Sequence, residues 1–180
     1  MTSTLKSNLR RLAVLSAAVA IAAGWVVAHG IGAESAQARG KYLVQLGGCT
    51  DCHTPGHFFG RPDMARFLGG SDLGIEAPGL GIFVAPNLTP DNDTGLGTWT
   101  KDDIVTAIRT GVRPDGRILA PIMPWRGYGA LTNSDAAAIA EYLRSLPPVT
   151  NKVPGPFGPD EKPPVFRMTI VPPSPSAQAN

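Results

Sequence analysis

The pattern of apolar and polar positions predicts three short helices in the chain beyond residue 35. The first covers residues 36–47 and the last covers residues 134–146. The last helix carries an apolar stripe at the spacing i, i+3, i+4 and i+7, formed by Ile139, Tyr142, Leu143 and Leu146. We expect this stripe to pack against the first helix, whose apolar positions are Tyr42, Leu43, Val44 and Leu46.

Capping residues predict the ends of the second and third helices. Thr100, with Asp103 three positions later, predicts the start of the second helix, and Gly111 predicts its end. Thr132 and Asp135 form the same pattern before the third helix. Both helices are therefore expected to be short and well defined.

Two long stretches of the chain lack any such periodicity. Residues 54–97 are rich in glycine and proline, and predict a long loop region with one helical turn near residues 63–67. A compact domain rarely keeps a loop of this length unless it has a function or packs on a ligand. Residues 149–180 hold eight prolines and predict an extended, partly docked arm. The expected fold class is all-α, with short helices and long loops.

The amino terminus has the features of an export signal. Lys6, Arg10 and Arg11 precede an uncharged apolar run over residues 12–28. The run just reaches the lower length limit for a membrane-spanning helix, which favours a retained anchor, and a cleaved signal remains open. The expected organisation is a signal sequence or membrane-anchor helix, a compact domain and a proline-rich arm, over residues 1–35, 36–149 and 150–180.

Charge and cysteine usage exclude some classes of function. Residues 39–180 carry thirteen cationic and thirteen anionic side chains, so charge gives no sign of nucleic-acid binding. The 21 glycines and 18 prolines suit short helices joined by shaped loops better than a sheet. The two cysteines fall within four residues, which argues against a disulfide framework.

The motif Cys49-Thr50-Asp51-Cys52-His53 predicts covalent attachment of one haem c. Cysteines at i and i+3 lie on one side of a helical turn, so both sulfurs can reach the vinyl-derived carbons of one haem edge. The next residue then presents its imidazole to the iron. A disulfide or a Cys-x-x-Cys redox pair is the alternative, but neither needs the trailing histidine, and the redox pair is expected beside a βαβ pattern. Haem would also supply apolar surface to a small core.

The second axial ligand of the iron is expected to be Met123. It lies 70 residues beyond His53, between Pro121 and Pro124, and the two prolines would stiffen the loop that holds its thioether. The alternatives are Met64, Met168, His57 and open coordination. A methionine ligand would raise the reduction potential and close the iron to oxygen and peroxide.

Four further side chains are candidates for the haem environment because they can donate hydrogen bonds to the haem propionates or screen them. Each of them is as often a part of ordinary core packing. These residues are Trp99, Trp125, Arg126 and Tyr128.

Together these motifs resemble class I cytochromes c, and more narrowly the single-haem cytochrome c subunits of bacterial membrane-bound dehydrogenases for alcohols, aldehydes and related substrates. The resemblance spans about residues 36–149. It is carried by residues 39–43, 49–54, 85–90, 94–99, 121–125 and 142–148. It implies an all-α cytochrome c fold in which the first and last helices cross beside the haem, and it implies haem attachment and methionine ligation at the residues named above.

The expected function is one-electron transfer on the periplasmic side of the bacterial inner membrane. The chain would be an electron-transfer subunit and not itself an enzyme, relaying electrons from a dehydrogenase to a respiratory acceptor. A free periplasmic shuttle is the nearest alternative. A haem-based sensor or a peroxidase-like enzyme would require an open or exchangeable sixth position on the iron.

Overall fold

The structure is a computed structural model that describes residues 34–169 and residue 171. The described residues from Ser35 onward belong to one compact unit. The predicted signal or anchor helix falls almost entirely on residues 1–33, which lie outside the described residues. Within the described part, no helix is long and apolar enough to cross a membrane.

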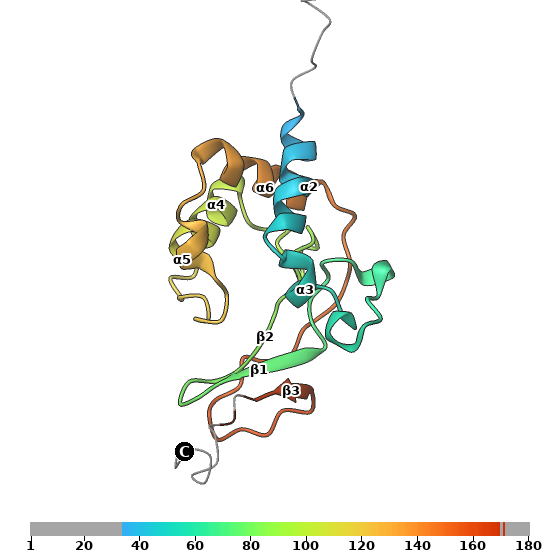
Figure 1. Cartoon of the computed structure of the whole chain (residues 1–180), viewed down its shortest axis with the longest axis vertical. Helices are drawn as coiled ribbons and strands as arrows, with labels where there is room; N and C mark the ends of the chain where they lie inside the picture. Colours follow the sequence, from blue (N-terminus) through green and yellow to red (C-terminus); the bar gives the residue numbers. More distant parts are fainter. Residues whose placement is uncertain (1–33, 170, 172–180) are drawn as a thin grey trace, which may run out of the picture. The chain divides into compact units, whose positions relative to one another are not determined.

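The three predicted helices are confirmed. They are α2 (Ala36–Leu46), α4 (Lys101–Thr110) and α6 (Asn133–Ser145), and Figure 1 shows α6 beside both of the others. Two shorter helices, α3 (Cys49–His53) and α5 (Trp125–Tyr128), and the 3₁₀ helices His57–Phe59 and Met64–Arg66 complete the helical elements of the described chain. The second 3₁₀ helix is the turn predicted near residues 63–67.

Side-chain caps explain why α4 and α6 begin where they do. The Thr100 side chain accepts a hydrogen bond from the Asp103 amide, and the Asp103 carboxylate accepts one from the Thr100 amide. The Thr132 side chain caps α6 through the Asp135 amide. Gly111 ends α4 at φ 77°, a backbone conformation that favours glycine.

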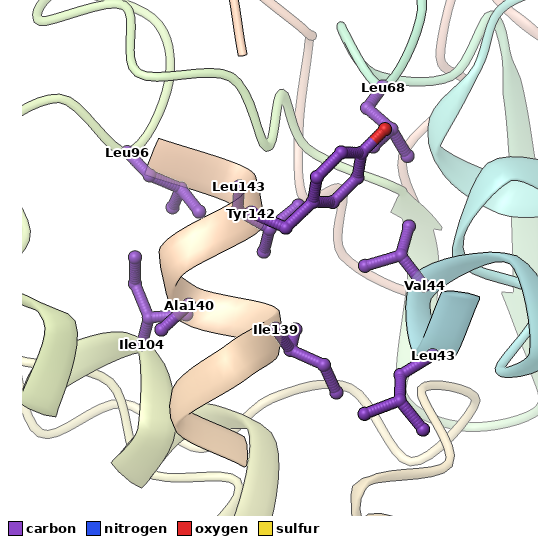
Figure 2. Close-up of a cluster of buried hydrophobic side chains, with 9 residues drawn as sticks. All are labelled: Leu43, Val44, Leu68, Leu96, Ile104, Ile139, Ala140, Tyr142 and Leu143. Atoms are coloured by element: carbon purple, nitrogen blue, oxygen red, sulfur yellow. The ribbon is translucent and has the colours of Figure 1, made fainter. Parts of the chain in front are cut away.

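The hydrophobic core lies where α6 crosses α2 and α4. Figure 2 shows α6 carrying Ile139, Ala140, Tyr142 and Leu143 toward Leu43 and Val44 of α2, Ile104 of α4, and Leu68 and Leu96 of the connecting loops. The helices approach so closely that a Cβ added at Gly40 would meet the Ala138 carbonyl oxygen at 1.9 Å. The predicted packing of the first helix on the last is therefore confirmed, although Tyr42 and Leu46 of α2 are largely exposed.

The all-α expectation is wrong in one respect, because the chain also forms a three-stranded sheet in the order β2-β1-β3. The antiparallel strands β1 (Leu73–Ala77) and β2 (Gly81–Val84) lie in the region predicted to be loop. Glycines in and around these short strands interrupt the alternation of apolar and polar residues, so the sequence pattern did not predict the strands. The β-branched and aromatic run in β2 is nevertheless typical of a strand.

The proline-rich arm supplies the third strand. β3 (Phe166–Met168) pairs in parallel with β1, and Phe157 forms an antiparallel bridge with Ile82 of β2. These pairs join residues separated by more than 70 positions in sequence, so no local pattern could have predicted them. The described part of the arm is thus part of the compact unit.

Candidate functional site

The two cysteines lie on one turn of helix directly after α2. Gly48 at φ 66° forms the corner between α2 and α3, and Cys49 and Cys52 follow at i and i+3. Both are free, partly buried thiols. The helical turn expected for the motif is therefore present.

Burial makes both thiols weak acids. It raises the pKa of Cys49 to about 11, and it also raises the pKa of Cys52, with a smaller contribution from the Asp51 carboxylate. Both groups are therefore neutral thiols near pH 7. Redox-active dithiols lower the pKa of at least one cysteine, so the upward direction of both pKa shifts argues against a Cys-x-x-Cys redox pair.

The His53 imidazole is buried and held in one orientation. Its Nδ1 lies 2.7 Å from the Pro86 carbonyl oxygen, which can only accept, so Nδ1 carries the proton and donates. Burial lowers the pKa of His53 and keeps the ring neutral. Nε2 is therefore the ring nitrogen with a lone pair, as a metal-binding histidine requires.

Helix α5 is attached to the end of α2, two residues before the first cysteine. The Tyr128 hydroxyl donates a hydrogen bond to the Gly47 carbonyl oxygen at 2.5 Å. Burial is the main cause that raises the pKa of Tyr128 to about 12. The negative charges that Cys49, Cys52 and Asp51 carry when ionised raise it further. Tyr128 is therefore a structural link between α5, which begins two residues after Met123, and the end of α2 beside the cysteine motif.

Residues 111–125, which we call the Met123 loop, run from the end of α4 to Trp125, the first residue of α5. Met123 is half-buried, its amide donates to the Ala120 carbonyl, and its carbonyl accepts from the Trp125 amide. Three apolar side chains of this loop are exposed although they belong to a folded segment. They are Val112, Ile118 and Ile122, at 37%, 58% and 46% exposure.

The alternative iron ligands named in the sequence analysis lie in other elements. Met64 starts a 3₁₀ helix and Met168 lies on β3, and both side chains are more exposed than Met123. His57 Nε2 lies 3.5 Å from an Asp51 carboxylate oxygen. Within the described residues, no cluster of three or more His, Cys, Asp or Glu side chains could hold a metal ion.

Trp125 and Arg113 each bury a nitrogen that makes no hydrogen bond with any described residue. These atoms are Trp125 Nε1 and Arg113 Nε, and Arg113 Nε forms an ion pair with an Asp115 carboxylate oxygen at 3.4 Å. The Trp125 ring packs so tightly on Gly111 that a Cβ there would meet it at 2.6 Å. A buried donor without any partner is uncommon, and an acceptor on a bound group would satisfy Trp125 Nε1.

The other predicted environment residues have partners in the chain. The Arg126 guanidinium lies over the Trp125 ring at 4.3 Å, and the Arg113 guanidinium lies over the Trp99 ring at 5.2 Å. The Trp99 carbonyl accepts a hydrogen bond from Arg144. Sequence reasoning missed Arg113 because a lone arginine in a turn sequence carries no signal of its own.

The residues fit a covalently bound haem. Two neutral thiols lie on one helical turn, a neutral imidazole presents its lone pair on Nε2, and the buried Trp125 Nε1 suits a carboxylate of a propionate-bearing ring. The exposed apolar side chains of the Met123 loop suit its macrocycle. The fold and this donor set together define a c-type cytochrome.

Comparison with known proteins agrees, because residues 37–147 match the family model described as cytochrome c. The chain belongs to the cytochrome c family, and membership implies covalently bound haem c. The resemblance inferred from the motifs is thereby confirmed.

The relatives include cytochrome subunits of dehydrogenases. The cytochrome c subunit of the quinone alcohol dehydrogenase of Gluconobacter oxydans is 34% identical over 83% of this chain and 30% of its own length. The gluconate 2-dehydrogenase cytochrome c subunit of Pantoea cypripedii is 36% identical over 62% of this chain and 23% of its own. A diheme cytochrome c-type protein of Cereibacter sphaeroides is 34% identical over 61% and 36%. The chain thus spans about a quarter to a third of the length of these relatives.

Proposed function

We propose that this chain carries one electron at a time through a single haem c attached to Cys49 and Cys52, with His53 and Met123 as the axial ligands. The observation that carries the proposal is the His53 imidazole, whose Nδ1 is engaged by the Pro86 carbonyl so that Nε2 is free to bind iron directly beside two thiols. Bound haem would supply an iron centre that alternates between the ferric and ferrous states.

The protein would supply the ligands of the iron and would keep other molecules from binding to it. A thioether from Met123 would fill the second axial position, favour ferrous iron relative to two-histidine ligation, and prevent oxygen or peroxide from binding. The half-burial of Met123, compared with the greater exposure of Met64 and Met168, supports this assignment. Electron transfer without bond chemistry follows from such closed coordination.

We further propose that the cytochrome is exported and serves as an electron-transfer subunit. It would accept electrons from a dehydrogenase of the alcohol or aldehyde type and pass them to a respiratory acceptor. The names of the relatives as cytochrome subunits of dehydrogenases support this role, and the basic and apolar amino terminus supports placement on the periplasmic side, anchored or released after cleavage.

The direct test is expression of the full chain in a host with cytochrome c maturation. The purified protein should give a pyridine haemochrome spectrum with one haem per chain, and the pigment should stay with the protein in acidified acetone. A redox titration should fit a single one-electron step. Protein that lacks haem, or releases it to acidified acetone, would overturn the proposal.

The subunit role has its own test. The cytochrome purified from its natural host should be reduced when substrate is added to a dehydrogenase identified by mass spectrometry in the same complex. A soluble monomer that starts near Ile31 and has no such donor would favour the free shuttle. Rapid binding of carbon monoxide by the reduced native protein would favour a sensor or a peroxidase-like enzyme.

A further inference from the structure

The side chain of Asn87 is a buried hub next to the carbonyl that holds His53. It is 1% exposed, and all four of its hydrogen-bonding positions are used. Its amide nitrogen donates to the Val149 carbonyl at 2.6 Å and to the Thr94 hydroxyl at 3.1 Å. Its oxygen accepts from the Thr89 amide at 2.9 Å and from the Thr89 hydroxyl at 2.7 Å.

Residues 149–151, which we call the clasp, join the arm to this hub. The Val149 amide donates to the Thr89 hydroxyl at 3.0 Å, and the Asn151 amide donates to the Thr94 hydroxyl at 3.0 Å. The Asn151 side chain donates to the Gly69 carbonyl at 2.7 Å. The clasp therefore binds two separate loops that meet at His53.

Those two loops hold His53 from opposite ends of the residue. Pro86, which precedes Asn87, accepts from the imidazole Nδ1, and Gly70, which follows Gly69, donates its amide to the His53 carbonyl at 2.8 Å. The Leu88 amide donates to the Leu68 carbonyl at 2.8 Å and joins the two loops to each other. Moving the clasp would therefore move the groups that orient the imidazole.

We propose that Asn87 and the clasp are positioning elements for the His53 ring, through which the start of the carboxyl-terminal arm sets the reduction potential of the haem. The proposal rests on the proposed ligation of haem iron by His53. A hydrogen bond from the outer ring nitrogen to a carbonyl makes the ligating nitrogen more basic, which favours ferric iron. Removing hydrogen bonds of the Asn87 side chain should weaken the hydrogen bond between His53 Nδ1 and the Pro86 carbonyl. The reduction potential should then rise.

The test uses full-length, haem-loaded protein with the hub altered at nearly constant shape. Thr89→Val keeps the volume of a fully buried side chain and removes the hydroxyl that bonds Asn87 and the clasp. We expect an upward shift of the midpoint potential and faster deuterium exchange of the His53 Nδ1 proton, followed by NMR. Asn151→Ala breaks only the outer bond to Gly69 and should give smaller shifts in the same directions, and it remains available if Thr89→Val does not fold.

The matched control is Thr132→Val, which removes a helix cap on α6 and should lower stability without touching either loop. It should lower the melting temperature and leave the potential and the Nδ1 exchange unchanged. If Thr89→Val and Asn151→Ala behave as this control does, the hub is only structural and the inference is wrong. A parent protein without covalent haem would instead overturn the proposed function, so the two failures are distinguishable.

Discussion

The His53 side of the site and the Met123 loop differ in how far the polypeptide satisfies its own groups. On the His53 side the buried polar atoms of Asn87 and Thr89 are all hydrogen-bonded. In the Met123 loop Trp125 Nε1 is buried without a hydrogen bond to any described residue, and apolar side chains such as Ile118 are exposed.

The difference indicates which parts of the site need the haem. The chain itself completes the support of the imidazole, because carbonyls, amides and hydroxyls from three segments meet there. The Met123 loop needs an apolar surface for its aliphatic side chains and an acceptor for Trp125 Nε1. We therefore expect substitutions in this loop to change the properties of the haem-loaded protein, because the haem is the group that these side chains would contact.

The largest effect should come from removing both thiols. Cys49→Ala combined with Cys52→Ala leaves no atom for covalent attachment, so covalent haem should be lost completely, as measured by the pyridine haemochrome of protein extracted with acidified acetone. Cys49→Ala alone keeps one sulfur and should retain part of the covalent pigment. Covalent haem in the double variant would show that the motif is not the attachment site.

The next largest effect should come from Met123→Ala. Without the thioether the reduced protein should change from unreactive to fully reactive toward carbon monoxide, followed by its absorption spectrum, and the reduction potential should fall. Met64→Ala is the control and should leave both properties unchanged. Reactivity toward carbon monoxide in the Met64 variant, but not in the Met123 variant, would reassign the ligand.

A smaller effect is expected for the unpartnered donor. Trp125→Phe removes Nε1 and keeps a ring against Gly111, so it should lower the free energy of unfolding of the haem-loaded protein by about 1.5–3 kcal/mol if the donor bonds a haem carboxylate. Denaturant titration followed by haem absorbance would measure this loss. Trp99→Phe is the matched control, and an equal loss in both variants would indicate ring packing as the cause.

The smallest effect should distinguish two exposed aliphatic side chains. Ile122 and Leu80 are 46% and 57% exposed, and only Ile122 lies in the Met123 loop. Ile122→Ser should lower the free energy of unfolding of the haem-loaded protein by about 1 kcal/mol because the haem covers the side chain, whereas Leu80→Ser should be close to neutral. Equal values for the two variants would mean that no haem surface covers Ile122.

The helices could be predicted from sequence because their signals are local. The caps at Thr100 and Thr132, the stop at Gly111 and the stripe on α6 each depend on residues within one or two turns of one another. The third strand of the sheet could not be predicted in the same way, because β3 lies in the arm and pairs with β1, which is far from it in sequence. The site divides likewise: Cys49, Cys52 and His53 form one contiguous motif, but the partner of His53 is a backbone carbonyl of a kind that every residue carries.

The sequence alone determined the class of this protein, because two thiols one helical turn apart and a following imidazole predict haem attachment from five consecutive residues. Only the tertiary structure decided what holds that imidazole, since the Pro86 carbonyl, the Asn87 hub and the clasp come from segments far apart in the chain. Contacts of this kind depend on how loops close around a core, and the closure is a property of the whole fold.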